Sequence, residues 1–252
     1  MRLQSVDGVV HLVMDTGKAN ALGPDFLASL ERTLEEAESQ GAPALVLTGY
    51  GAHFSAGLDL PALLPLPRAE MKALIVTFCR AMLRLFTMPL PVVAAVNGHA
   101  VAGGCVLAMQ ADVRLLADGD LRFGLKEAQL GIGLPALVVE TLRCQVPAAA
   151  LVPVALEGRL FTPAEALRLG LVEAVVPRAD LLAAATARAR ELAAVPRAAY
   201  AQIKGALHEP VVRRIRHGAE ADEAWLDSWF SDEGRRRVGA MVEELAKRKG
   251  AS

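Results

Sequence analysis

The segment Pro91–Gly104 reads PVVAAVNGHAVAGG and leads into the apolar run Cys105–Gln110. Its first part, Pro91–Asn97, is rich in Val and Ala, and it is long enough for a buried strand but too short for a helix. Asn97-Gly98 is a turn signal. The pair Gly103-Gly104 then predicts the start of a helix.

A buried strand, a turn and a helix start leave backbone N–H groups free at the first helical turn, where the helix dipole is positive. Such a helix start can stabilise negative charge that develops on a ligand. A second interpretation fits equally well, in which the two glycines only let the helix pack closely against the sheet. This segment alone does not separate the two.

Composition excludes several classes of function for the 252-residue chain. It is 53% hydrophobic, which is enough for a substantial core. Lys+Arg 27 and Asp+Glu 28 give a net charge of −1, so there is no electrostatic case for binding nucleic acid or an anionic membrane. Three cysteines in apolar surroundings indicate a reducing compartment. With no signal-type start and no membrane-length apolar run, we expect a cytoplasmic protein.

Strands alternate with helices along most of the chain, which predicts βαβ units and an α/β fold. After residue 195 every segment has helical spacing, so we expect a core over residues 1–194 and a C-terminal helical subdomain over residues 195–252. The predicted strands are Gly8–Asp15, Ala44–Thr48, Pro91–Asn97, Asp112–Ala117, Leu121–Gly124 and Leu171–Val176. Late in the chain the predicted helices are Pro147–Leu156, Pro196–His208, Val211–Phe230 and Asp232–Lys249.

The loop Phe54–Leu60 reads FSAGLDL and follows a predicted strand. Its small residues let a ligand approach the backbone closely, and the N–H groups around Leu58 can point at an oxygen. The candidate ligand-contact residues of this loop are Ser55, Ala56, Gly57 and Asp59. If the N–H groups of Leu58 and Gly103 converge on one carbonyl oxygen, they form an oxyanion hole. An ordinary surface turn is the alternative.

Glu127 is the candidate acid or base. It stands among apolar residues in RFGLKEAQLGI, and partial burial would raise the pKa of its carboxylate towards a range useful for a general base. The alternative is an exposed loop carboxylate paired with Lys126. No metal-ligand spacing occurs, because the five histidines are scattered, and neither G-x-S-x-G nor G-K-[ST] is present.

Five segments together resemble the crotonase (enoyl-CoA hydratase/isomerase) family, and the resemblance spans nearly the whole chain. In chain order they are Lys18–Leu22 (KANAL), Phe54–Leu60, Asn97–Cys105, Phe123–Ile132 and Thr162–Val176. Each segment is a weak signal alone. Their order and spacing identify the family.

The resemblance implies a crotonase-like spiral core of ββα turns, and C-terminal helices that assemble a homotrimer or hexamer. It implies an acyl-CoA thioester as ligand, held at its thioester oxygen by the N–H groups of Leu58 and Gly103, with Glu127 as the acid–base residue. The residues along the ligand path would be Ser55, Ala56, Gly57, Asp59 and Lys126. No metal and no separate cofactor are implied, since CoA is part of the substrate.

Two positions depart from the patterns of that family. Its hydratases carry two catalytic glutamates, whereas here the first position is Val106 and the second is Glu127. One carboxylate suffices to take a proton from C2 and return it at C4, so the sequence most resembles the Δ3,Δ2-enoyl-CoA isomerase branch. Lys126 stands where those isomerases tend to have Asn, which leaves the acyl group open.

The alternatives are an atypical hydratase, a hydrolase, a decarboxylase, or a non-catalytic acyl-CoA-binding protein. The apolar C-terminal residues around Trp225 and Trp229 fit core packing, a trimer contact or a lid over the acyl tail.

Overall fold

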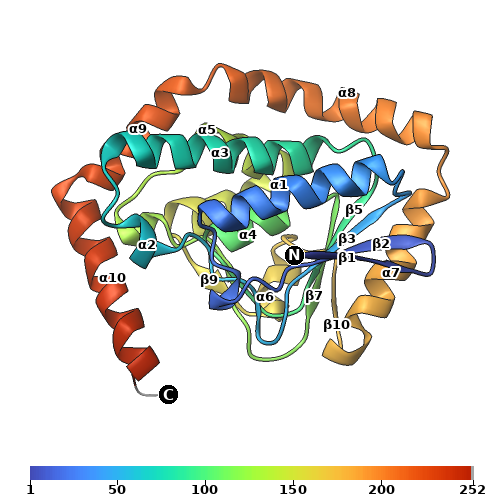
Figure 1. Ribbon diagram of the computed structural model, residues 1–252, viewed down its shortest axis with the longest axis horizontal. Helices are drawn as coiled ribbons and strands as arrows, with labels where there is room; N and C mark the ends of the chain where they lie inside the picture. Colours follow the sequence, from blue (N-terminus) through green and yellow to red (C-terminus); the bar gives the residue numbers. More distant parts are fainter. Residues whose placement is uncertain (251–252) are drawn as a thin grey trace.

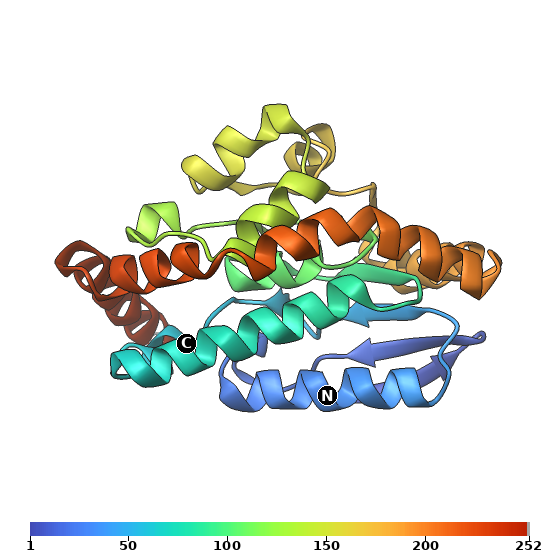
Figure 2. The same cartoon turned by 90° about the horizontal axis from the view of Figure 1, so that it is seen from above.

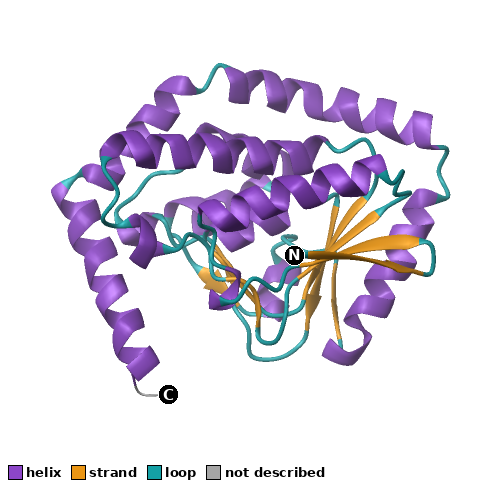
Figure 3. Cartoon of the chain, viewed as in Figure 1, coloured by secondary structure: helices purple, strands orange, loops and turns teal. Residues whose placement is uncertain are grey.

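The computed structural model describes residues 1–250, apart from the side chains of residues 219–221 and 248–250. Strands gather at one side of the molecule, and long helices run alongside one another across the rest (Figure 1). Colouring by secondary structure shows helices around most of the strands, but the N-terminal strand Arg2–Val6 lies at the surface and is largely exposed (Figure 3). The predicted α/β fold is confirmed.

Six strands form the main sheet, in the order β1-β2-β3-β5-β7-β10. Its first two strands pair antiparallel across the Asp7-Gly8 turn, and all other neighbours are parallel. The strands are β1 (Arg2–Val6), β2 (Val9–Val13), β3 (Leu45–Thr48), β5 (Val92–Val96), β7 (Val113–Ala117) and β10 (Ala174–Val176). Every residue of β3, β5 and β7 is buried, as expected in a sheet covered on both faces. The one charged side chain among them, Arg114 of β7, donates to the Leu171 and Ala111 carbonyls.

A smaller sheet has the order β4-β6-β8-β9. It consists of β4 (His53–Ser55), β6 (His99–Val101), β8 (Phe123–Gly124) and β9 (Leu160–Phe161). The strands β4 and β6 pair in parallel, so the loops that follow them lie side by side. The turn before β6 requires glycine, because a Cβ atom on Gly98 would lie 2.1 Å from the Ala52 carbonyl oxygen. We did not predict β4, β6 or β9, which are only two or three residues long. The equally short β8 and β10 lie within longer segments that the sequence predicts as strands.

Helices surround both sheets. They are α1 (Pro24–Ser39), α2 (Leu60–Leu63), α3 (Arg68–Thr87), α4 (Gly103–Met109), α5 (Ala136–Gln145), α6 (Pro163–Arg168), α7 (Leu181–Ala193), α8 (Arg197–Arg216), α9 (Ala219–Phe230) and α10 (Asp232–Gly250). Shorter helical turns are η1 (Lys18–Asn20), η2 (Ala128–Leu130), η3 (Ala148–Ala150), η4 (Val152–Leu156) and η5 (Arg178–Asp180). The main sheet packs against α7, and the smaller sheet against α4.

Two helix predictions need correction. We expected a break near Pro210, but α8 continues through that residue and the break comes at Gly218. There a Cβ atom would lie 2.3 Å from the Cβ of Ala136, so packing against α5 decides where the helix ends. The predicted helix Pro147–Leu156 is instead the two short turns η3 and η4.

The C-terminal helices lie across the rest of the chain (Figures 1 and 2). Of these, α8 packs against α3 and α5, α9 packs against the same two helices, and α10 reaches α2 and η2. Residues 195–250 therefore pack on the core through α3, α5, α2 and η2.

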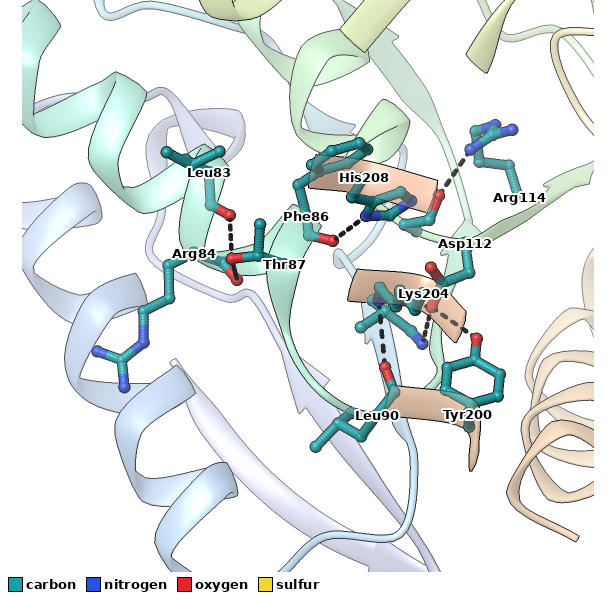
Figure 4. A network of polar contacts seen from close by, with 12 residues as sticks. Leu83, Arg84, Phe86, Thr87, Leu90, Asp112, Arg114, Tyr200, Lys204 and His208 are labelled. Carbon is teal, nitrogen blue, oxygen red and sulfur yellow. Dashed lines mark hydrogen bonds and ion pairs between the residues drawn. The ribbon is translucent and has the colours of Figure 1, made fainter. Parts of the chain in front are cut away.

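A buried polar network fastens α8 to the core (Figure 4). The Lys204 ammonium donates to the Asp112 carboxylate at 2.8 Å and to the Leu90 carbonyl at 3.2 Å. The same carboxylate oxygen accepts from the Tyr200 hydroxyl at 3.0 Å and from the Val92 N–H at 2.8 Å. Burial lowers the pKa of Lys204, and the neighbouring Asp112 charge opposes that shift.

Replacing Lys204 with Met is expected to lower the free energy of unfolding by about 3 kcal/mol, because it leaves the Asp112 carboxylate enclosed without its cation. Urea denaturation measures the loss. Lys72→Met is the matched control, since Lys72 is exposed and pairs with Glu223 on the surface, where a pair is worth less than about 1 kcal/mol. Similar losses in the two variants would contradict the anchoring role.

Candidate active site

Two backbone N–H groups, from separate loops, lie close together beside the smaller sheet. A Cβ atom on Gly103 would lie 3.5 Å from the Leu58 nitrogen, and one on Gly57 would lie 3.1 Å from the Gly103 nitrogen. Within the described residues, neither Leu58 nor Gly103 donates its N–H to a protein acceptor. Because Gly103 is the first residue of α4, its N–H is one of those that a helix start leaves free.

The two glycines at the start of α4 have different surroundings. A Cβ atom on Gly104 would lie 2.2 Å from the Ser55 carbonyl oxygen, so this residue permits the close packing of α4 on β4. Gly103 contributes the free N–H.

The residue that precedes α4 has an unusual backbone. Ala102 has φ 52° and ψ −124°, a conformation that an L-residue rarely adopts and that stores of order 1–3 kcal/mol. It is held by its N–H, which donates to the Gly124 carbonyl at 2.9 Å, and by its carbonyl, which accepts from the Val106 N–H at 3.0 Å. This kink directs the start of α4 towards the loop that contains Leu58.

Glu127 lies at the entrance to η2, after β8. Its carboxylate accepts a hydrogen bond from the Lys126 N–H at 2.8 Å. Burial raises the pKa of Glu127, and the N–H groups of Lys126 and of Glu127 itself partly oppose the shift by stabilising the carboxylate. The described contacts include no ion pair between the Lys126 ammonium and this carboxylate, so the alternative of a simple surface pair has no support.

A narrow cavity of about 50 Å³ brings these groups together. Its lining residues are Ala56, Leu58, Leu60, Ile75, Phe78, Ala102, Gly103, Val106, Glu127, Leu130, Ile132, Pro135, Val138 and Trp225. Among these, Glu127 is the one ionisable side chain. Val106, from α4, lies in the same cavity wall, so no second carboxylate stands at that position. The cavity can therefore hold an apolar ligand next to two N–H donors and one half-buried carboxylate.

The sequence-predicted residues fall into two groups. Ala56, Leu58, Gly103 and Glu127 line the cavity. The others do not line it. Ser55 is fully buried, and Gly57 bends the loop with φ 86°. Asp59 accepts from the Ala62 N–H at the start of α2 and pairs with Lys18 at 3.4 Å, and Lys126 is half-buried.

Sequence reasoning missed two contributors to this site and left a third open. Asn20 ties the loop to Met14, just after β2, through its side chain, and Ala102 carries the backbone kink. Trp225, for which core packing, a trimer contact and a lid over the acyl tail were all considered, lines the cavity from α9. Only the KANAL motif gave a signal for the first. Backbone kinks and the course of a distant helix have no local signature.

The described residues contain no group of three His, Cys, Asp or Glu side chains placed to hold a metal ion. No helix in the described part of the chain is both long enough and apolar enough to cross a membrane.

The profile of the enoyl-CoA hydratase/isomerase family matches residues 4–249. The chain belongs to this family. It is 31% identical over 247 residues to human mitochondrial enoyl-CoA delta isomerase 1, covering 96% of this chain and 82% of the human protein. It is 39% identical over 188 residues to a Thermus thermophilus protein with an enoyl-CoA hydratase name, covering 73% of this chain and 74% of that one.

The crystal structure of human mitochondrial Δ3-Δ2-enoyl-CoA isomerase superposes with a TM-score of 0.92 at 30% identity, covering 98% of each chain. The fold and the family resemblance are thereby confirmed. The relatives of this chain carry both isomerase and hydratase names, so the reaction has to be argued from the site.

Proposed function

We propose that the protein isomerises 3-enoyl-CoA thioesters to 2-enoyl-CoA thioesters. The observation that supports this most is the cavity wall, where Glu127 is accompanied by Val106 and not by a second carboxylate. Adding water to a double bond requires groups that hold and polarise the water, and a valine side chain cannot do so. Moving a double bond requires one base that can also return the proton.

The steps follow from the geometry. The N–H groups of Leu58 and Gly103 donate to the thioester oxygen, which makes the C2 protons more acidic. The Glu127 carboxylate takes one C2 proton, and the electrons spread over a dienolate whose oxygen the two donors stabilise. The protonated Glu127 then delivers the same proton to C4. Electrons and atoms balance, and no water enters the product.

The raised pKa of Glu127 suits both halves of this cycle. A carboxylate that is costly to bury in its charged form is a stronger base, and its protonated form is stable enough to be reused as an acid. The apolar lining keeps water away from the dienolate, which limits protonation from solvent.

The test incubates the purified protein with a 3-enoyl-CoA and, separately, with a 2-enoyl-CoA. Absorbance at the conjugated thioester band and product mass are followed. We expect conjugation to appear without a change in mass. A gain of the mass of water from the 2-enoyl substrate, at a rate comparable with isomerisation, would instead support an atypical hydratase.

Family resemblance also leads us to propose assembly as a homotrimer or as a hexamer made of two trimers. Light scattering tests this, since a trimer has three times the 26.6 kDa mass of the chain.

Trp225 is expected to limit the length of the acyl chain, because it lines the cavity together with α3 and α5 residues. Replacing Trp225 with Phe would free space there, and kcat/KM for longer acyl chains is expected to rise about tenfold relative to short ones. Rates across an acyl-length series measure the change.

Trp229→Phe is the control for this prediction. Trp229 stacks on Trp225 with ring centroids 5.6 Å apart and is fully buried, yet it does not line the cavity. An equal shift in chain-length preference from both variants would show that the effect comes from loosened helix packing.

A further inference from the structure

The loop that carries Leu58 is held almost entirely by the segment that contains the KANAL motif. The Ala56 N–H donates to the Ala19 carbonyl at 3.0 Å, and the Asp59 N–H donates to the Leu22 carbonyl at 3.3 Å. The Gly57 N–H donates to the Ser55 Oγ at 3.2 Å. Within residues 56–59, all of which the structure describes, only the Leu58 N–H has no protein acceptor.

The direction of the Leu58 N–H depends first on one hydrogen bond. The carbonyl of Gly57 accepts from the Leu22 N–H at 2.7 Å. In a trans peptide the C=O and the following N–H point in opposite directions. The Leu58 N–H therefore points away from Leu22, on the side where the cavity lies.

Gly57 is the flexible point of this arrangement. Its φ of 86° lies in the left-handed region, which glycine enters without strain. The peptide on its C-terminal side is held by Leu22, and the peptide on its N-terminal side is held by the Ser55 hydroxyl. Without that hydroxyl, the glycine would be held on one side only and the Leu58 N–H could turn.

Ser55 has no hydroxyl proton left for a ligand. Its Oγ donates to the Asn20 carbonyl at 2.8 Å and accepts from the Gly57 N–H, and the residue is fully buried. A hydroxyl has a single proton to donate, so Ser55 acts on the backbone of the loop.

Asn20 fixes the carbonyl that Ser55 uses. Its Nδ2 donates to the Met14 and Phe54 carbonyls at 2.9 and 3.0 Å, and its Oδ1 accepts from the Thr16 N–H and hydroxyl at 3.0 and 3.1 Å. These four bonds use the full capacity of a side-chain amide. They also hold Asn20 at φ 53°, at the end of a left-handed turn.

We propose that Ser55 and Asn20 are positioning residues that aim the Leu58 N–H at the ligand oxygen, through Gly57. The ligand itself, a thioester, rests on the function proposed above. Neither side chain touches the substrate. The motif Lys18–Leu22 orients one of the two donors, the Leu58 N–H.

The test replaces Ser55 with Ala and binds a conjugated aryl acyl-CoA thioester that has no proton to lose at C4. Hydrogen bonding to the thioester oxygen moves the absorbance of such a probe to longer wavelength. We expect Ser55→Ala to lose most of this shift and to lower kcat about tenfold for a 3-enoyl-CoA, with KM changed less than about threefold, because one donor is misaligned.

Thr48→Val is the matched control, since Thr48 also has a buried hydroxyl that donates to a carbonyl, that of Ala95 at 2.9 Å, but lies in β3 away from the loop. It is expected to lower the melting temperature by a similar amount while keeping the shift and kcat. Ser55→Cys, which retains a weak donor and acceptor at this atom, is expected to fold and to show an intermediate shift.

If both Ser55 variants shift the probe absorbance as far as the parent protein does, the proposal is overturned. Loss of probe binding in Ser55→Ala would also overturn it, because Ser55 would then contact the ligand. An unshifted probe in the parent protein would also overturn it. A further result separates this proposal from the proposed function. If the parent protein shifts the probe absorbance and Ser55→Ala does not, the positioning role stands. If the parent then isomerises no 3-enoyl-CoA, the proposed reaction alone fails.

Discussion

Replacing Glu127 with Gln is expected to lower kcat for 3-enoyl-CoA isomerisation by a factor of about 10²–10⁴, the usual contribution of a positioned acid–base group. Gln keeps the size and polarity of the side chain but cannot take a proton from C2. Binding of the acyl-CoA is expected to change little, because the two N–H donors and the apolar lining remain. Stopped-flow absorbance measures the rate, and calorimetry measures the affinity.

Glu157→Gln is a suitable control, because Glu157 is an exposed acid outside the cavity. A Glu127→Gln variant with the rate of the parent would exclude Glu127 as the base, and the retained affinity would then point to a binding role for the site.

The pH dependence of the parent protein also tests the role of Glu127. Glu127 must be ionised to act as a base, and burial raises its pKa above 4.5. The acidic limb of the kcat/KM profile is therefore expected at higher pH than for an exposed glutamate. An acidic limb near the ordinary glutamate value would indicate that the carboxylate is well hydrated in the free protein.

As pH rises through the pKa of Glu127, the contribution of this residue to the free energy of unfolding should fall while activity rises. Because the folded-state pKa is raised, the unfolded chain releases this proton first, and ionised Glu127 destabilises the fold as pH rises from 4.5 through the folded-state pKa. Gln does not titrate. Thermal unfolding at pH 4 and pH 8 should therefore show the Gln variant gaining stability relative to the parent at the higher pH.

Replacing Gly104 with Ala is expected to lower kcat by a factor of about 10²–10³, the loss that follows removal of one oxyanion donor. The new Cβ would lie 2.2 Å from the Ser55 carbonyl oxygen and 2.8 Å from its carbonyl carbon. Both are backbone atoms, so α4 must move away from β4. That movement separates the Gly103 N–H from the Leu58 N–H.

The substitution also overpacks the core, which costs about 1–3 kcal/mol of the free energy of unfolding. The measurements are kcat and urea denaturation on the same preparation. Gly205→Ala is the control: it lies in α8 with nothing within 4 Å of the added Cβ, and it is expected to stabilise the helix by about 1 kcal/mol. Undiminished turnover by Gly104→Ala would mean that the two donors need not be close.

Much of the site could be predicted because its chemistry depends on residue type. A glutamate among apolar residues, a valine at a position where hydratases have glutamate, and small residues in FSAGLDL are all visible in the sequence. The cavity brings Glu127, Leu58 and Gly103 together from loops that follow three different strands. Whether they perform isomerisation stays a prediction until turnover is measured.

What could not be predicted depends on backbone conformation and distant packing. The kink at Ala102 has no residue-type signature, since alanine is an unusual choice for a positive φ. The end of α8 is decided by the contact of Gly218 with Ala136 and not by Pro210, so local helix preference pointed to the wrong residue. Trp225 lines the cavity only because α9 crosses α3 and α5.

Trp225 of α9 lines the cavity beside residues of α3 and α5, so the C-terminal helices form part of its wall. The same chain also secures its own covering helix: Arg235 of α10 donates to the Leu64 carbonyl at 2.6 Å, and Arg237 donates to the Gln129 carbonyl at 3.1 Å. Helix α10 is therefore fastened at two separate backbone positions, one at the end of α2 and one in η2.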